Sequence, residues 1–202
     1  MRWLRPASCI AALVLTANSC GSSATAPSAT PVTLHGEVSD PVGDALTDSR
    51  VPVPPDLIHA TADVAAGSVT FIVQLAPGTL DRQTTRVGVL LDTDQNPSTG
   101  IRQQDGIGAD YTIDMAAGTG QASVAKADQV GCAAHVSCFN AVGSTPITFV
   151  ADGMQVTVPL SLLGNASGRM TFEFNSYVLV APLTPVIFDW MPNIDAPPGR
   201  VQ

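Results

Sequence analysis

Apolar and polar residues alternate along several stretches of the chain beyond Leu34. In residues 57–64 every second position is apolar, and residues 69–75 repeat the pattern after a short Ala-Ala-Gly-Ser turn. A period of two is typical of a strand with one face in a core and the other toward solvent. The two stretches therefore predict the strands of an antiparallel hairpin.

The same criteria predict further strands along the rest of the chain. They cover residues 86–92, 109–115, 121–127, 146–150, 154–160, 169–181 and 187–191. Asp152-Gly153 is a strong signal for a two-residue hairpin turn. Helix is scarce, with one turn expected at residues 161–165 and Gly164 as its stop. About nine strands at regular spacing predict an all-β fold, a single antiparallel β-sandwich of jelly-roll type.

The first residues have the pattern of a secretory signal. Arg2 and Arg5 precede an apolar run at residues 7–16, which is shorter than the ~20 apolar residues that a membrane-spanning helix needs. Residues 17–20, Ala-Asn-Ser-Cys, resemble the bacterial lipobox, with Ala17 in place of the usual Leu. One interpretation is that Cys20 is lipidated and anchors an exported protein to the membrane. The alternative is that the signal is simply cleaved and the protein is secreted.

After Cys20 the composition changes from apolar to small and polar residues. Residues 20–32 are rich in Ser, Ala, Thr and Pro, a composition typical of a flexible tether. The sequence therefore predicts a signal peptide at 1–19, a tether at 20–32 and a β-sandwich domain at 33–202. That domain would stand at the outer face of the bacterial cell membrane or, without the lipid, be secreted.

The charge is acidic and carried mostly by Asp. The formal net charge is −8, and loss of the predicted signal with Arg2 and Arg5 would bring it to −10. The remaining Lys and Arg residues are scattered, so the sequence offers no basic patch for nucleic acid. Any membrane contact would come from the lipid on Cys20, not from surface charge.

Two cysteines remain for the domain, Cys132 and Cys138. In an exported protein two such residues are expected to form a disulfide. The alternative is a metal or redox site that includes His135, although zinc usually has four ligands and closer cysteine spacing.

Residues 90–100, Leu-Leu-Asp-Thr-Asp-Gln-Asn-Pro-Ser-Thr-Gly, contain the strongest candidate for a metal site. Asp92, Asp94 and Asn96 place oxygen side chains at alternate positions, which suits a hard cation such as Ca²⁺. Pro97 and Gln103 stand where an EF-hand needs Gly and Glu, so this is not an EF-hand.

The loop that follows is long and stays acidic. It runs from Gln95 to Asp110 and carries Asp105 and Asp110 as further oxygen donors. A connection of this length is uncommon in a hairpin without a functional reason. We therefore expect structural calcium in this loop, with a solvated polar loop as the alternative.

A second acidic turn occurs earlier, at residues 40–44, Asp-Pro-Val-Gly-Asp. Asp40 and Asp44 flank a Pro and a Gly, so the turn could fold around a cation. The alternative is a solvated loop in which the aspartates bond to their own backbone.

In their order along the chain, these motifs resemble a known group of domains. The Asp-Pro-Val-Gly-Asp turn, the hairpin at 55–75, the 90–100 stretch, Gly-Ala-Asp-Tyr-Thr-Ile and the terminal stretch at 188–199 are similar to DOMON-like and carbohydrate-binding-module-like bacterial β-sandwiches. In particular they resemble the glucodextranase C-terminal-type module. The resemblance implies a jelly-roll sandwich with calcium at Asp40 and Asp44 and at Asp92, Asp94 and Asn96, and in some members sugar binding.

Sugar recognition would require exposed aromatic rings. Trp190 and Tyr111 are the candidate contacts, although both also suit packing roles. The sequence has no Gly-x-Ser-x-Gly, His-Glu-x-x-His or phosphate-loop motif. We expect a non-enzymatic envelope protein with a binding or structural role. The alternatives are a module that binds polysaccharide and a small secreted hydrolase with an unrecognised site.

Overall fold

The computed structural model describes residues 33–103, 106–181 and 183–202, which belong to one compact unit. The predicted signal at 1–19 and the tether at 20–32 lie outside the described residues. Cys20 lies there too, and so does Asp105 in the long loop.

The described residues form thirteen strands, one α-helix and two 3-10 helices. The first strands are β1 (Leu34–Ser39), β2 (Leu57–Ala65), β3 (Ser68–Leu75), β4 (Thr85–Asp92), β5 (Ile101–Arg102), β6 (Gly108–Ala109) and β7 (Tyr111–Ala116). They are followed by β8 (Gln121–Ala127), β9 (Phe139–Val150), β10 (Gly153–Pro159), β11 (Met170–Val180), β12 (Thr184–Met191) and β13 (Gly199–Val201). The helices are η1 (Ala117–Thr119), α1 (Gln129–Ala133) and η2 (Leu160–Leu163).

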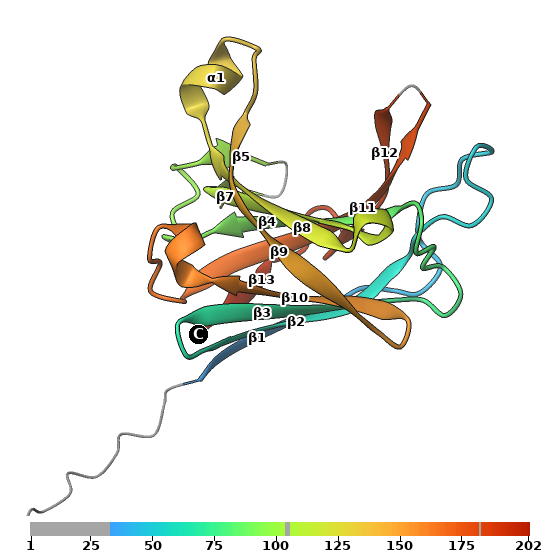
Figure 1. The fold of residues 1–202 in the computed structure, drawn as a ribbon, viewed down its shortest axis with the longest axis horizontal. Helices are drawn as coiled ribbons and strands as arrows, with labels where there is room; N and C mark the ends of the chain where they lie inside the picture. Colours follow the sequence, from blue (N-terminus) through green and yellow to red (C-terminus); the bar gives the residue numbers. More distant parts are fainter. Residues whose placement is uncertain (1–32, 104–105, 182) are drawn as a thin grey trace, which may run out of the picture. The chain divides into compact units, whose positions relative to one another are not determined.

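Eleven of these strands make one antiparallel sheet that folds over on itself in two layers, and β5 and β6 form a separate two-stranded sheet (Figure 1). The order of the large sheet is β1-β2-β3-β10-β9-β8-β7-β4-β11-β12, with β13 also paired to β11. Strand β9 runs from one layer into the other, because its first part pairs with β8 and its last part with β10. On the opposite side, backbone hydrogen bonds between His35 and Gln202 join β1 to the end of β13. The predicted all-β antiparallel fold with little helix is confirmed.

The core lies between the two layers and follows the predicted alternation. Phe71 of β3 meets Phe172 and Phe174 of β11 edge to face, with ring centroids 5.8–6.1 Å apart within the triad. All three rings are fully buried. Edge-to-face packing adds a contribution of about 0.5–1.5 kcal/mol per pair beyond the area buried.

The strand prediction missed β1, β5, β6 and β13, and it is wrong for the start of β9 and for the turn that follows this strand. Strand β9 begins at Phe139 and not at residue 146, because its first half exposes residues on both faces and so lacks the alternation that marks a strand. The β9–β10 turn consists of Ala151 and Asp152, since Gly153 already pairs with Val150 as the first residue of β10. Gly153 serves close packing, because a side chain there would collide with the backbone of β3.

Other local predictions are confirmed. Helix η2 ends at Gly164, which adopts the left-handed conformation with a φ of 68°. Residues 128–138, which join β8 to β9, form an arm that we call the β8–β9 arm. Within it, Cys132 and Cys138 form a disulfide, which leaves neither sulfur as a free thiolate for a metal. The arm carries α1, whose first turn is capped by the Asp128 side chain accepting the Gly131 N–H at 2.8 Å.

Candidate cation-binding sites

The loop between β4 and β7 (residues 93–110) brings three carboxylates together. Asp92 is the last residue of β4 and Asp110 directly precedes β7. These strands pair up to Leu91 and Tyr111, and the Asp110 N–H donates to the Leu91 carbonyl at 2.7 Å. Both ends of the loop are therefore adjacent. One carboxylate oxygen each of Asp92, Asp94 and Asp110 lies within 4.8 Å of the others.

Local hydrogen bonds hold these carboxylates in place. The Asn96 N–H donates to Asp92 Oδ1 at 3.0 Å and to Asp94 Oδ1 at 2.9 Å. The Thr93 N–H and hydroxyl donate to Asp110 Oδ2 at 3.0 and 2.8 Å. The short β5–β6 ribbon closes the rest of the loop. The oxygens are therefore positioned by the fold of the loop before any ion binds.

The cluster is electrostatically unfavourable without a cation. Asp92 is only 2% exposed, and burial raises its pKa to about 6. A hydrogen bond with the Asp94 carboxyl and the charges of Asp94 and Asp110 act in the same direction, while the Asn96 N–H opposes them. A bound cation would replace the proton that this arrangement favours.

Of the other predicted ligands of this loop, the structure describes only Asn96. The Asn96 side-chain oxygen accepts the Ser98 N–H at 3.1 Å, which gives it a part in the turn itself. Asp105 cannot be placed, because it lies outside the described residues.

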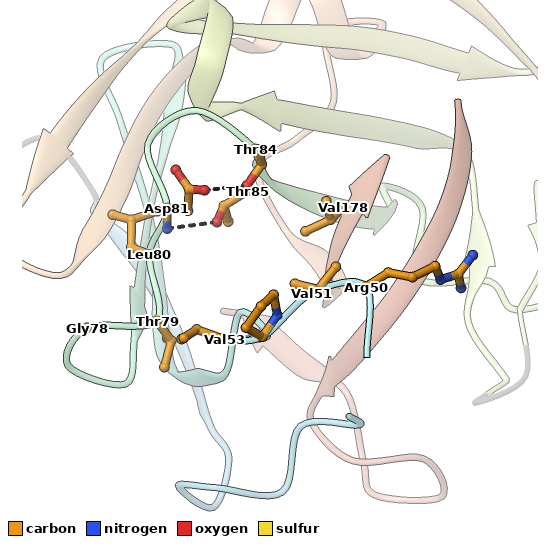
Figure 2. Close-up of a pocket in the computed structure, with 11 residues that line it drawn as sticks. Arg50, Val51, Val53, Gly78, Thr79, Leu80, Asp81, Thr84, Thr85 and Val178 are labelled. Atoms are coloured by element: carbon orange, nitrogen blue, oxygen red, sulfur yellow. Dashed lines mark hydrogen bonds between the residues drawn. The ribbon is translucent and has the colours of Figure 1, made fainter. Parts of the chain in front are cut away.

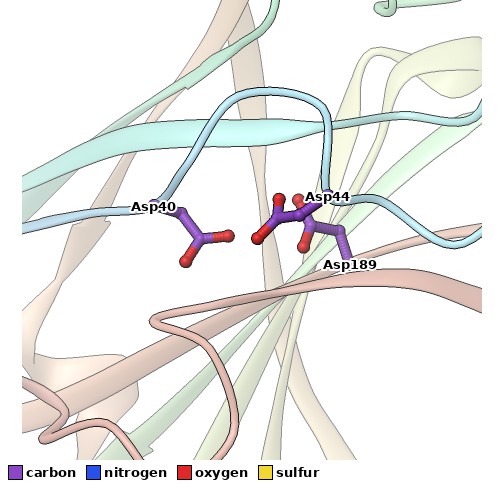
Figure 3. A group of neighbouring side chains, drawn as sticks. All are labelled: Asp40, Asp44 and Asp189. Carbon is purple, nitrogen blue, oxygen red and sulfur yellow. The ribbon is translucent and has the colours of Figure 1, made fainter.

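A second cluster forms where the loop between β1 and β2 (residues 40–56) meets β12. Figure 3 shows Asp40 and Asp44 on the loop and Asp189 on the strand, with their carboxylates pointing toward one another. One oxygen of each lies within 4.8 Å of the others. Gly43, between the two loop aspartates, has a φ of 88°, which Gly adopts readily and other residues seldom do. Asp189 was not among the residues predicted from the sequence.

Backbone and amide groups fix the second cluster as well. The backbone N–H of Asn193 donates to Asp40 Oδ1 at 3.1 Å, and its side-chain amide donates to Asp44 Oδ2 at 2.8 Å. Asp189 accepts the Leu57 N–H at 2.6 Å and the Trp190 N–H at 2.8 Å. The cluster thus joins the β1–β2 loop, β2, β12 and the segment after β12.

A fourth carboxylate, Asp56, lies directly beneath this turn. Its Oδ2 accepts the Gly43 N–H at 2.8 Å, and the residue is 4% exposed. Two oxygens here are buried and have no hydrogen-bond partner among the described residues, Asp56 Oδ1 and Asp40 Oδ2. Buried polar atoms normally have a partner, so two such atoms at one turn suggest a missing ligand.

Burial and the proximity of these acids raise the pKa of two of them, Asp40 and Asp189. Burial, followed by the charge of Asp44, raises the pKa of Asp40 to about 6, and the charge of Asp56 contributes as well. Burial raises the pKa of Asp189 to about 7, with the charges of Asp40 and Asp44 acting in the same direction. The native fold thus holds several acids that favour protonation or a bound cation.

Neither predicted sugar contact is a fully exposed residue. Tyr111 is 5% exposed and belongs to the core, while Trp190 is half-buried on β12. Stacking on a pyranose needs an accessible ring face, so these positions give little support to a sugar platform.

Comparisons with known proteins add no assignment. A scan against protein-family models found no matching family, and a search of curated proteins found no significant relative. The resemblance to DOMON-like modules therefore rests on the sequence motifs alone. Across the part of the chain that the structure describes, no helix is long and apolar enough to cross a membrane.

Both clusters offer the chemistry of a hard-cation site. Their donors are carboxylate oxygens, which favour Ca²⁺, Mg²⁺ or Mn²⁺ over metals that prefer nitrogen or sulfur. Among these ions, Mg²⁺ demands near-ideal octahedral coordination, whereas Ca²⁺ accepts six to eight oxygen ligands in a more flexible geometry.

Proposed function

We propose that this chain is an exported, lipid-anchored and non-enzymatic β-sandwich that binds structural calcium and has a binding or structural role at the cell envelope. Calcium would bind in the β4–β7 loop to Asp92, Asp94 and Asp110. Cys20 would carry the lipid, and residues 20–32 would form the tether between the membrane and the domain.

One observation carries the calcium part of the proposal. Asp92 and Asp110 lie at opposite ends of the β4–β7 loop (residues 93–110). The pairing of β4 with β7 nevertheless brings one carboxylate oxygen of each within 4.8 Å of Asp94. Three carboxylates so close together repel one another in the absence of a cation. Water and backbone oxygens would supply the remaining ligands of the six to eight that Ca²⁺ takes.

The envelope part rests on the sequence. The cationic start, the short apolar run and the Ala-Asn-Ser-Cys motif support export and anchoring. The disulfide between Cys132 and Cys138 suits an oxidising compartment outside the cytoplasm.

Thermal unfolding in Ca²⁺ and in chelator tests the calcium site. A ligand that binds only the native state raises its stability by RT ln(1 + [L]/Kd), which is about 2.7 kcal/mol at a hundred times the Kd. We expect Ca²⁺ to raise the melting temperature, with a smaller rise in Asp92→Asn and Asp94→Asn. Asp152→Asn is the matched control, because it removes an exposed carboxylate from the β9–β10 turn. Equal rises in all four proteins would refute the assignment.

Anchoring is tested separately in cells of a bacterial host. The full chain is expected to partition with the membrane fraction, and Cys20→Ser to be recovered in the soluble fraction. Recovery of the full chain in the soluble fraction together with Cys20→Ser would favour a cleaved, secreted form, and retention of both in the membrane fraction would contradict anchoring through Cys20.

A further inference from the structure

The β1–β2 loop (residues 40–56) has few apolar anchors. Its large apolar side chains at Val42, Leu46 and Val53 are 70%, 66% and 56% exposed. Between Asp44 and Asp56 its backbone makes two hydrogen bonds to strands: the Leu46 N–H donates to the Phe188 carbonyl at 2.7 Å, and the Pro55 carbonyl accepts the Ser176 hydroxyl of β11 at 2.6 Å. A segment with so little buried apolar surface belongs to the less stable part of a fold. Its position must therefore depend on polar contacts at its two ends.

Those polar contacts converge on the second acidic cluster. Asp40 and Asp44 come from the start of the loop, Asp56 from its end and Asp189 from β12. Asp56 is 4% exposed, and the Gly43 N–H directs its Oδ2 toward the turn while its Oδ1 lacks a partner. Asp40 Oδ2 is also buried without a partner. These unpartnered oxygens, and not the acidity alone, indicate an absent ligand.

We propose that Asp40, Asp44 and Asp189 bind a second Ca²⁺, with Asp56 beneath them supplying further negative charge, and that this ion fastens the β1–β2 loop to β12. The proposal rests on the proposed function only in that it takes the same ion. Oxygen donors from both the loop and the strand mean that the ion would have to leave before the loop could detach.

Fastening this loop also shapes a pocket. Residues 50–53 form one wall of a pocket of about 490 Å³, and residues 78–81 and 84–85 form the facing wall (Figure 2). Val51, Val53, Leu80 and Val178 give it apolar surface. Since one wall is the loop itself, the second Ca²⁺ would keep the pocket assembled, and its release would open it.

Limited trypsin digestion distinguishes the two calcium sites, because each loop carries its own arginine. Arg50 lies in the β1–β2 loop with its side chain 57% exposed, and Arg102 lies exposed in the β4–β7 loop. Cleavage at either residue requires local opening, and its rate follows the population of the open form. At ten times the Kd, Ca²⁺ should slow cleavage about tenfold, by the factor 1 + [L]/Kd.

The variants should differ in which of the two arginines Ca²⁺ protects from trypsin. In Asp44→Asn, Ca²⁺ should protect Arg102 but not Arg50, and in Asp94→Asn it should protect Arg50 but not Arg102. Asp189→Asn should behave like Asp44→Asn; Asp44 is exposed, so its variant keeps the test valid if Asp189→Asn does not fold. Asp152→Asn should retain both protections.

Each outcome has a defined meaning. If Ca²⁺ protects Arg102 but leaves Arg50 unprotected in the wild-type chain, the second site is refuted while the proposed function stands. If Ca²⁺ protects Arg50 equally in the wild-type chain and in Asp44→Asn, the assigned ligands are wrong. If neither bond is protected, both calcium sites are refuted.

Discussion

Replacing Asp40 with Asn should change the stability of the protein in opposite directions with and without calcium. Asn keeps an oxygen for the Asn193 N–H and puts an amide where Asp40 Oδ2 is buried without a partner. Without an ion, the native fold carries the penalty of a charged Asp40 beside Asp44 and Asp56. The neutral side chain removes that penalty, but it also removes a ligand for Ca²⁺.

The magnitude follows from the pKa of Asp40. A rise from 3.8 to about 6 corresponds to roughly 3 kcal/mol at 1.36 kcal/mol per unit. The cluster is open to water on the side of Asp44, so screening should reduce this to about 1–2 kcal/mol. For a domain of this size, the melting temperature of Asp40→Asn in chelator should lie roughly 2–8 °C above that of the wild type.

The pH dependence gives an independent check. Because the pKa of Asp40 is raised in the native state, the native protein binds this proton more tightly than the unfolded chain does. The penalty is therefore absent below 3.8, grows as the pH rises, and is fully present above about 6. The advantage of Asp40→Asn in chelator should be present at pH 8 and vanish near pH 4.

The assay is urea or thermal denaturation of both proteins in chelator at several pH values, repeated with Ca²⁺ at pH 8. In Ca²⁺ the wild type should become the more stable protein. A lower stability of Asp40→Asn than of the wild type in chelator at pH 8, or an advantage that does not change with pH, would show that charged Asp40 does not destabilise the native fold.

Three further predictions concern the loop, the core and the arm. Gly108→Ala should weaken calcium binding in the β4–β7 loop without removing a carboxylate, since its Cβ would collide with the Thr99 carbonyl; unchanged affinity in calorimetry would contradict this. Phe172→Ala should lower the free energy of unfolding by about 3–5 kcal/mol, measured by urea denaturation, because it opens a cavity in the aromatic triad. Replacing Cys132 and Cys138 with Ser should cost about 2–3 kcal/mol, because the closed loop is short. A larger loss in the same denaturation assay would mean that the core depends on the arm.

The strands that the sequence predicts well are those with one buried face. Residues 57–64 and 69–75 lie in β2 and β3, and their alternation matches the buried positions of the structure. Strand β9 was predicted too short because residues 139–145 expose both faces and therefore carry no periodic signal. Alternation of apolar and polar residues arises from burial of one face, so it cannot indicate a strand in which neither face is buried.

The two acidic clusters differ in how far the sequence can predict them. Asp92, Asp94 and Asp110 lie within one continuous stretch from the end of β4 to the start of β7, and the sequence already marked all three as oxygen donors of a cation site. Asp189 lies far along the chain from Asp44, and only the packing of β12 against the β1–β2 loop brings them together. Asp56 precedes β2 in a Pro-Pro-Asp-Leu stretch, where nothing in the local sequence indicates that its carboxylate turns back beneath Gly43.

The number of calcium ions bound per chain is the sharpest test of both calcium sites. Equilibrium dialysis against Ca²⁺ up to about 1 mM covers the affinity range of extracellular calcium modules. We predict two ions for the wild-type chain, one for Asp94→Asn and one for Asp44→Asn. Less than one ion per wild-type chain at the highest concentration would contradict the assignment of calcium to this β-sandwich.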